Sequence, residues 1–258
     1  MKKRCVFNDS LCFSINSDLE EYRINSIFQK EPETIAWIDS ICNSDSVFYD
    51  IGANIGIYTL YMNYKNPMMQ MFCFEPVQNN FNSLQNNIIL NNAKNVHPFN
   101  IALSNNNMIT NLFISDTRNG NSGAQIEAPI NEKGESFEVK KIEKILSFQL
   151  DYLVNNLNFP QPNFIKIDVE GAELEVLKGS LNVINKCNPV ILVEIQNGNS
   201  YEAIKELLSD YGYINISSDE KSRKLISKDS ITPISNFEEG TNNYVWINPS
   251  KPVSWHFI

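Results

Sequence analysis

Four apolar runs of the sequence each end in an acid: Asp50, Glu75, Asp168 and Glu194. Carboxylates at such positions can accept protons, bind cations or hold hydroxyl groups. A turn with the pattern Gly-x-x-x-Gly, Gly52–Gly56, follows the first acid. Glycine lets a backbone approach a ligand where a Cβ would clash, and a helix start offers unpaired N–H groups. The acids and the turn therefore predict a ligand site built from strand ends.

The ligand predicted for this turn is a nucleoside without phosphates. Glu75 closes the second apolar run and can accept both hydroxyls of a ribose. The turn lacks the middle glycine of Gly-x-Gly-x-x-Gly, which argues against a pyrophosphate lying on it. Asn54, inside the turn, could hydrogen-bond a methionine carboxylate or adopt a left-handed conformation, and both alternatives are open. S-adenosylmethionine is the leading candidate.

Asp168 and Glu170 are the candidate catalytic residues. They are two positions apart and share their parity with Lys166, so an extended backbone points all three side chains the same way. Either carboxylate could accept a proton as a general base. The alternative is a surface salt bridge, with Glu170 as an acid at a helix start. Glu173 and Glu175 are expected on a solvated helix face.

The apolar runs alternate with helical patterns. Strands are expected at 47–50, 70–74, 96–102, 163–168 and 189–195, with late strands at 212–217 and 244–247 separated by a polar loop. Helices are expected near 18–29 and at 33–41, 57–64, 79–90, 170–181 and 201–211. Apolar strands separated by helices predict an α/β fold with a parallel sheet covered on both faces.

One catalytic domain is expected at residues 45–258, preceded by an irregular N-terminal cap at 1–44. A polar segment near 104–142 breaks the alternation after the third strand and is interpreted as an insertion, which could close over an acceptor as a lid. Asparagine is abundant at 79–107. It is interpreted as compositional bias, because the apolar pattern continues through it.

The composition narrows the class of protein. The chain has 258 residues, 42% of them apolar, which suffices for one large core. The formal net charge is −9 without a basic stripe, so nucleic acid is not an expected partner. No apolar run reaches the ~20 residues that span a membrane, and no signal peptide is visible. The five scattered cysteines favour free thiols, with Cys73 and Cys187 buried, and a cytoplasmic location.

The chain resembles the FkbM-type methyltransferases, a branch of the class I S-adenosylmethionine-dependent enzymes. The resemblance covers about residues 45–215, and its motifs are 50–56, Phe74-Glu75-Pro76, 101–104 and, with the highest specificity, 164–179. It implies a Rossmann-like class I methyltransferase fold with a mostly parallel seven-stranded sheet flanked by helices. It also implies methyl transfer to a hydroxyl, often on a sugar, a lipid-linked glycan or a natural product.

The resemblance also implies which residues bind the cofactor. These are Asp50, Gly52, Asn54, Gly56, Glu75, Pro76 and Ala102, where Ala102 is expected to end the third strand and leave room for adenine. The acceptor is expected to be a small molecule or a glycan. Neither its identity nor the oligomeric state follows from the sequence.

A metal is not expected. Catechol-type methyltransferases hold Mg²⁺ with acids of two strands, and Asp168 with Glu194 have suitable spacing, but a hard cation needs several oxygen ligands and no convincing third one is visible. The two histidines, His97 and His256, are far apart in the sequence, which gives little support to a histidine-based site.

Two other functions stay open. A nicotinamide-dependent oxidoreductase is disfavoured by the missing glycine of the turn. A non-catalytic binding protein that retains the fold is disfavoured by the acids at the strand ends, although these do not exclude it.

Overall fold

A computed structural model describes residues 2–7, 9–41, 45–126, 128–131, 134–196, 198–217 and 242–250. Most of the polar loop expected between the two late strands, and His256, lie outside the described residues.

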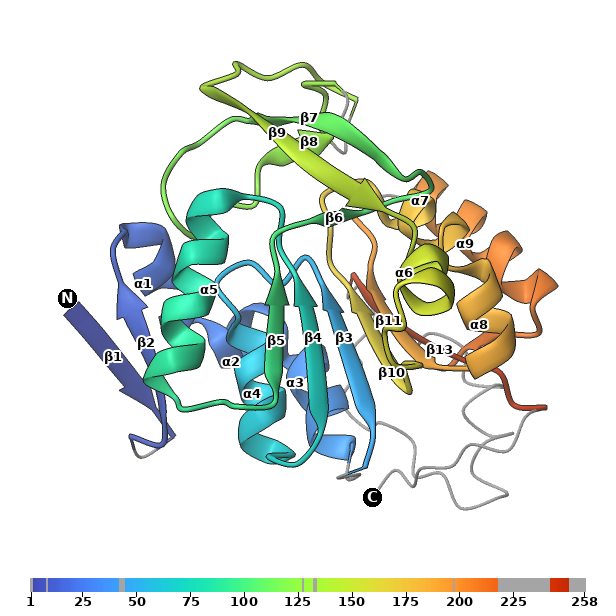
Figure 1. Cartoon of the computed structure of the whole chain (residues 1–258), viewed down its shortest axis with the longest axis horizontal. Coiled ribbons are helices and arrows are strands. Elements are labelled where there is room, and N and C mark those ends of the chain that lie inside the picture. Colours follow the sequence, from blue (N-terminus) through green and yellow to red (C-terminus); the bar gives the residue numbers. More distant parts are fainter. Residues whose placement is uncertain are drawn as a thin grey trace.

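The centre of the molecule is a seven-stranded sheet (Figure 1). Its strands are β3 (Val47–Ile51), β4 (Gln70–Phe74), β5 (Val96–Phe99), β10 (Phe164–Ile167), β11 (Val190–Glu194), β12 (Ile214–Asn215) and β13 (Asn243–Ile247). Their order is β12-β13-β11-β10-β3-β4-β5. Neighbours from β11 to β5 are parallel, whereas β13 is antiparallel to both of its neighbours. The predicted mostly parallel seven-stranded sheet is confirmed.

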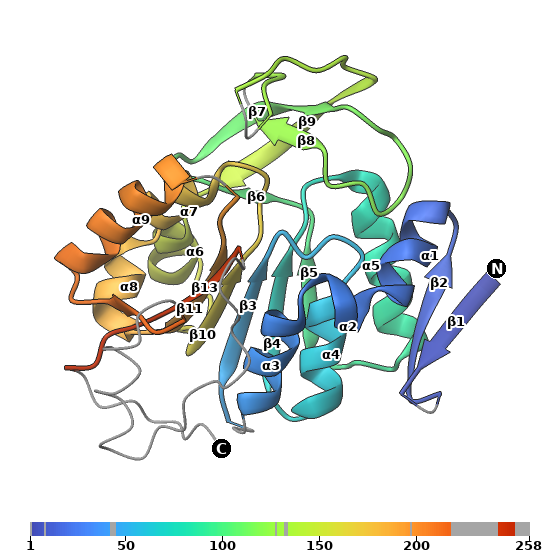
Figure 2. The same ribbon diagram turned by 180° about the vertical axis from the view of Figure 1, so that it is seen from behind.

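Helices cover both faces of this sheet (Figures 1 and 2). One face carries α3 (Pro32–Ser40), α4 (Ile57–Lys65) and α5 (Gln78–Leu90); the other carries α6 (Leu150–Asn156), α7 (Glu173–Lys178), α8 (Leu181–Cys187) and α9 (Gly198–Asp210). The strands are apolar throughout because successive side chains point to opposite faces of the sheet and both faces are buried. In β3, Phe48 belongs to the same core as Trp37 of α3, whereas Tyr49 belongs to the same core as Leu208 of α9 on the other face.

Three expected elements are broken in the structure. The helix expected near 18–29 is divided at Ser26 into α1 (Asp18–Asn25) and α2 (Ile27–Lys30). The strand expected at 96–102 ends at Phe99, and Ala102 lies instead on β6 (Ala102–Leu103), which leaves the main sheet. The helix expected at 170–181 is split into α7 and α8 around Gly179. A Cβ at Gly179 would lie 2.1 Å from the Ser104 carbonyl oxygen, so the start of the insertion crosses the chain at this break. Helix α6 was not predicted.

The expected insertion forms a second sheet beyond the carboxyl ends of β3, β4 and β5 (Figure 1). It contains β7 (Met108–Ile114), β8 (Ala124–Ile126) and β9 (Lys141–Phe148), joined to β6 in the order β6-β9-β7-β8. Buried Leu112, Ile114 and Ile145 of this sheet pack with Val77 and Ala102. The insertion is therefore anchored by an apolar core of its own.

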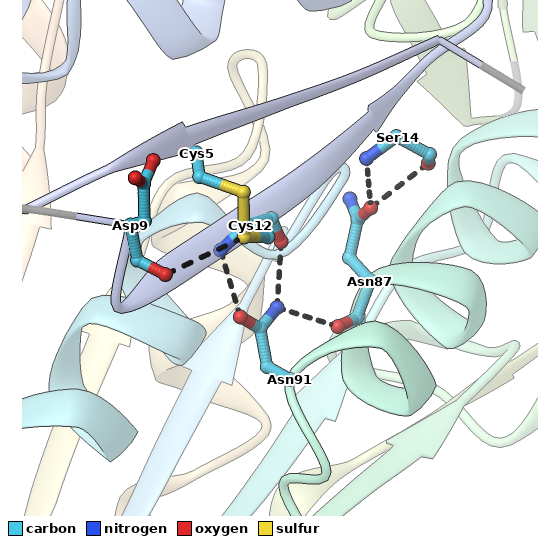
Figure 3. Close-up of a disulfide and its surroundings, with 6 residues drawn as sticks. All are labelled: Cys5, Asp9, Cys12, Ser14, Asn87 and Asn91. Atoms are coloured by element: carbon cyan, nitrogen blue, oxygen red, sulfur yellow. Dashed lines mark hydrogen bonds between the residues drawn. A yellow bond between two sulfur atoms is a disulfide. The ribbon is translucent and has the colours of Figure 1, made fainter.

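The N-terminal segment is more regular than expected. A hairpin of β1 (Lys2–Val6) and β2 (Leu11–Ile15) precedes α1 (Asp18–Asn25), α2 (Ile27–Lys30) and α3. Figure 3 shows β2 held on α5 by two asparagines. The Asn87 side-chain oxygen accepts hydrogen bonds from the Ser14 amide (2.8 Å) and hydroxyl (2.9 Å), while Asn91 accepts from the Cys12 amide and donates to its carbonyl.

The interpretation of the asparagines as compositional bias is thus wrong for two residues of α5, Asn80 and Asn87. Asn80 and Asn87 are buried to within 1% of their surface, and their side chains bind other segments of the chain. An asparagine side chain both donates and accepts, so it can satisfy exposed backbone groups of a neighbouring segment.

The four cysteines that lie within the described residues divide into two kinds. Cys73 (buried) and Cys187 (half-buried) are free thiols, as predicted for these two, but Cys5 and Cys12 form a disulfide across the hairpin (Figure 3). Disulfides persist in oxidising surroundings, whereas the cysteine pattern had predicted a reducing one, so the compartment stays a prediction. Within the described residues, no helix is long and apolar enough to cross a membrane.

Candidate functional site

A cavity of about 470 Å³ lies at the carboxyl ends of β3, β4, β10 and β11. Its walls come from the turns that follow these strands, from β6 to β8, and from the N-terminal helices α1 and α2. It brings together seven of the predicted site residues: Gly52, Asn54, Glu75, Pro76, Ala102, Asp168 and Glu170. The other two, Asp50 and Gly56, do not line it.

The glycine turn is closed by its own hydrogen bonds. Every backbone N–H from residue 52 to residue 56 already donates within the protein. The acceptors are the Phe74 carbonyl for the first two, then a Glu75 carboxylate oxygen, the Asn54 side chain and the Ala53 carbonyl. The turn itself therefore has no unpaired N–H at residues 52–56, and the unpaired N–H groups expected at the helix start would be those of residues 57–59 in the first turn of α4.

Asn54 adopts the left-handed conformation, one of the two alternatives that the sequence left open; a bond to a methionine carboxylate stays a prediction. Its backbone is left-handed, with φ 51°. Its side-chain oxygen accepts from the Ile55 amide (3.0 Å), and its side-chain nitrogen donates to the Asn121 carbonyl (3.1 Å). The side chain thus stabilises the turn and ties it to the insertion.

The two glycines of the turn are required by close packing. Both have φ +85°, a conformation that favours glycine. A Cβ on Gly52 would lie 1.9 Å from the Asp168 carbonyl oxygen, and one on Gly56 would lie 2.4 Å from Leu84 of α5. The turn after β3 is therefore pressed against the loop after β10, which fixes the backbone of Asp168.

Glu75 is the buried acid of the β4 end, with 4% of its surface exposed. Its carboxylate accepts from the amides of Val77 (2.9 Å) and Asn54 (2.8 Å). Burial raises the pKa of Glu75 to about 7, opposed by these hydrogen bonds and by Asn80 and Arg23. A carboxylate has about four lone-pair sites, so it retains acceptor capacity for ligand hydroxyls.

Asp50 does not line the cavity, although the next residue, Ile51, does. The Asp50 carboxylate is buried, accepts from the Thr59 hydroxyl (2.5 Å), and has one oxygen 4.0 Å from the Lys166 ammonium. Burial raises the pKa of Asp50, while Lys166 and Thr59 lower it. The Asp50 carboxylate is thus a second negative charge, besides Asp168, beside the buried Lys166 ammonium.

Lys166 binds the acid that follows β10, Asp168. The Lys166 side chain is 1% exposed, and its ammonium lies 2.7 Å from an Asp168 carboxylate oxygen. Burial alone would raise the pKa of Asp168, but the Lys166 charge and a hydrogen bond with Glu194 hold it well below its ordinary value. The Asp168 charge, together with burial, raises the pKa of Glu194 to about 9. These opposite shifts indicate that the two carboxyls share one proton at neutral pH.

A third carboxylate joins this pair from the N-terminal segment. Single oxygens of Glu31, Asp168 and Glu194 lie within 4.8 Å of one another. The expectation that the chain offers no third acid here is therefore wrong. Two ammonium groups already balance these acids, since Lys30 lies 2.8 Å from Glu31 and Lys166 contacts Asp168. Carboxylate oxygens could ligate a hard cation, but such an ion takes six or more oxygens. The absence of a metal stays a prediction.

The loop between β10 and α7 differs from the expected helix start. Glu170 lines the cavity from this loop and precedes the first residue of α7. Glu173 was expected on a solvated face, but it is 4% exposed and accepts from the Gly171 amide (2.9 Å). Burial raises the pKa of Glu173 to about 7. Glu175, half-buried, pairs with Lys178 (2.8 Å).

The sequence did not identify several residues that line the cavity. Arg23 and Lys30 come from the N-terminal helices, Gln125 from the insertion and Gln196 from the segment after β11. None of them belongs to a recognisable motif, because each is placed by contacts between segments distant in the chain.

A family model for the methyltransferase FkbM domain matches residues 50–214. The chain is 33% identical over 148 residues to "Methyltransferase 1" of Beauveria bassiana, covering 52% of this chain and 58% of that protein. It is 31% identical over 199 residues to the hexuronic acid methyltransferase AglP of Haloferax volcanii, covering 77% of this chain and 75% of that protein. The alignment thus spans somewhat more than half the length of the first relative.

Among solved structures, an FkbM methyltransferase from Methylobacillus flagellatus aligns with a TM-score of 0.47 at 15% identity, over 90% of this chain and 56% of that one. The matched family segment begins at Asp50 and ends within β12, so it contains the glycine turn, Glu75, Asp168 and Glu194. The chain belongs to the FkbM methyltransferase family.

Proposed function

We propose that the protein is an S-adenosylmethionine-dependent O-methyltransferase. The observation that carries the proposal is one cavity at the carboxyl ends of four parallel strands, bordered by Glu75, Asp168, Glu170 and Glu194. Open α/β sheets bind ligands at this edge. Membership of the FkbM methyltransferase family supports the same reaction class.

The residues present fit this cofactor. Glu75 is placed to accept hydrogen bonds from ribose hydroxyls, and the apolar side chains of Ile101, Ala102 and Leu103 offer a surface for adenine. When bound, the cofactor supplies an activated methyl group on a sulfonium. The acids around Asp168 favour a positively charged centre nearby, because opposite charges attract strongly in a partly buried site.

Two carboxylates are proposed to act on the acceptor, in different ways. Asp168 stays ionised and is a weak proton acceptor, because Lys166 and Glu194 hold its pKa well below the ordinary value. We assign it an electrostatic role beside the reacting centre. Glu170, on the same loop and lining the same cavity, is the proposed general base for the acceptor hydroxyl. Alignment of the reacting groups supplies the rest of the acceleration.

The proposed acceptor is a molecule rich in hydroxyl groups, such as a sugar or a glycan. Ser122, Gln125 and Gln196 line the cavity together with Glu170. Such side chains donate and accept hydrogen bonds, as sugar hydroxyls require. The name of the Haloferax relative, a hexuronic acid methyltransferase, makes uronic acids the first acceptors to test.

The test combines binding with turnover. Calorimetry should show binding of S-adenosylmethionine and S-adenosylhomocysteine, and no binding of NAD. Release of S-adenosylhomocysteine should then depend on an added glycan. Preferential NAD binding would favour an oxidoreductase. Cofactor binding without turnover on a broad panel of uronic-acid and neutral glycans would favour a binding protein that retains the fold.

A further inference from the structure

We propose that Arg23 binds the α-carboxylate of the methionine portion of S-adenosylmethionine, which makes the N-terminal segment part of the cofactor site. This inference rests on the proposed function. It assigns a role to a residue that lies outside the matched family segment, residues 50–214.

The glycine turn has no unpaired backbone N–H at residues 52–56 with which to bind the carboxylate. A carboxylate bound at such a turn commonly takes its hydrogen bonds from backbone N–H groups. Here all N–H groups from residue 52 to residue 56 donate to protein acceptors. Residues 57–59, in the first turn of α4, do not line the main cavity, although Ile57 and Tyr58 line a smaller cavity beside the turn. Backbone amides could therefore supply hydrogen bonds there, but the negative charge of the carboxylate still needs a cationic partner.

The wall of the cavity carries several acids. Glu75, Asp168, Glu170 and Glu194 all line it. An anion placed among these acids needs a cation beside it, since an unpaired buried charge is costly. Of the residues that the structure describes, the cavity is lined by two cationic side chains, Arg23 and Lys30.

Arg23 and Lys30 differ in the partners that they already have. The Lys30 ammonium is already paired with Glu31 at 2.8 Å. Arg23 forms no ion pair with a carboxylate of the described chain, and its Nε donates to the Gly120 carbonyl at 2.5 Å. That hydrogen bond orients the guanidinium while leaving the terminal nitrogens as donors. A guanidinium fork matches a carboxylate with two parallel hydrogen bonds.

Arg23 lies beside the glycine turn. A smaller cavity adjoins the glycine turn, and it is lined by Arg23, Ile27, Gly52, Asn54 and Asp168 among others. Arg23 is also close enough to Glu75 to lower its pKa. Arg23 thus spans from the acid proposed to hold the ribose to the turn along which the methionine chain would lie.

The experiment compares two ligands that differ in the amino-acid portion. S-adenosylhomocysteine carries the carboxylate, whereas 5′-methylthioadenosine has the same nucleoside thioether without it. Calorimetry on Arg23→Gln should show S-adenosylhomocysteine binding weakened about 10- to 100-fold, as for loss of a charge-assisted pair, and 5′-methylthioadenosine affinity nearly unchanged. Arg4→Gln, an exposed arginine of β1, is the matched control and should change neither affinity.

A purely structural role for Arg23 predicts a different result. Loss of the bond to Gly120 would disturb the wall of the cavity and weaken both ligands alike, which would overturn the inference. Unchanged binding of both ligands, with an increased KM for an acidic acceptor, would also overturn it and move Arg23 to the acceptor. Arg23→Lys, which retains the charge, should show an intermediate loss confined to S-adenosylhomocysteine; it serves if the glutamine variant does not fold.

The inference and the proposed function fail differently. If the wild-type protein binds neither ligand, the proposed cofactor is wrong and the role of Arg23 falls with it. If the wild type binds both, and Arg23→Gln binds both equally well and turns over with unchanged KM values, only the role of Arg23 is wrong.

Discussion

Two regions of the molecule, here called the strand-end region and the outer region, are held in shape by different kinds of contact. The strand-end region comprises the carboxyl ends of β3, β4, β10 and β11 with the turns that follow them. Its shape depends on backbone contacts, such as the approach of Gly52 to the Asp168 carbonyl and the two bonds to the Phe74 carbonyl. Its residue types are therefore narrowly restricted, and they form motifs.

The outer region comprises the N-terminal segment (residues 2–40) and the insertion (residues 104–142). Besides its apolar packing, it is held by polar side chains that bridge distant parts of the chain. The Asn80 side chain donates to the Asn121 carbonyl and accepts from the Gly120 amide, the Ser17 hydroxyl donates to the Asn119 carbonyl, and Arg118 pairs with Asp18. Many polar residues could make such contacts, so no motif marks them.

This difference revises the idea of the insertion as a lid. Residues 119–121 are tied to the start of α1 and to α5 by the hydrogen bonds above, and Gly120 and Asn121 line the cavity. In this structure they form part of its wall. A closing motion, if the enzyme uses one, would have to come from another part of the insertion.

The largest expected effect tests whether the strand-end region performs the chemistry. We predict that Glu170→Gln lowers kcat by at least ~10²-fold, in line with loss of a general base. Asp168→Asn should lower kcat to a similar extent by removing the charge that Lys166 fixes. Cofactor affinity should change far less in both, because the groups act in the transition state. Steady-state kinetics with the true acceptor would check this, and wild-type turnover in both variants would contradict it.

The next prediction tests whether backbone contact dictates the motif. Gly52→Ala places a Cβ 1.9 Å from the Asp168 carbonyl oxygen at φ +85°, so the free energy of unfolding should fall by about 3 kcal/mol or more. Gly134 is the matched control, since it has φ +79° with nothing within 4 Å of its Cβ position. Gly134→Ala should cost only about 1 kcal/mol. Equal losses in denaturant titrations would show that backbone conformation alone explains Gly52.

A third prediction concerns the outer region. Asn87 is fully buried and makes hydrogen bonds to Ser14 and to the Ile55 carbonyl. Asn87→Ala leaves these groups unpaired, and the free energy of unfolding should fall by about 2–4 kcal/mol. Asn86→Ala, on the exposed side of the same helix, should stay within about 0.5 kcal/mol of wild type. A similar stability for the two variants would mean that the hairpin contributes little.

A fourth prediction uses the coupled acids. The pKa of Glu194 is raised from 4.5 to about 9, so the folded protein binds the Glu194 proton more tightly than the unfolded chain does. The contribution of Glu194 to the free energy of unfolding is therefore fully present below about pH 4.5 and is lost as the pH rises toward 9. Glutamine does not ionise, so Glu194→Gln should show a smaller decrease in stability between pH 5 and pH 9.

The control for this pH series is Glu202→Gln. Glu202 is an exposed acid of α9, 3.7 Å from Lys205, and its replacement should leave the pH dependence unchanged. Glu75 and Glu173, whose pKa values are raised to about 7, lose their contribution between about pH 4.5 and 7 in wild type and both variants. An identical slope for wild type and Glu194→Gln would contradict the shared proton.

The smallest expected effect is that of chelation. Lys30 and Lys166 already balance the acids Glu31 and Asp168, so turnover should be unchanged in EDTA. Loss of activity in EDTA, restored by Mg²⁺, would turn the three acids into a metal site and change their proposed roles.

The sequence determined the central sheet and the acids that end its strands. Apolar runs between helical patterns are restricted by burial on both faces, and this restriction is strong enough to be read directly. It located β3, β4, β10 and β11 to within a residue or two. Seven of the nine residues predicted for the site line one cavity because parallel strands bring their carboxyl ends together.

Only the tertiary structure decided the rest of the site. The break after β5, the direction of Asp50 toward Lys166, and the entry of Arg23, Lys30 and Glu31 into the site depend on contacts between distant segments. Such contacts follow from how separate elements pack in space. A side chain such as Arg23 shows no local sign of its role, because its surroundings include residues about 30 to 145 positions away, from Gly52 to Asp168.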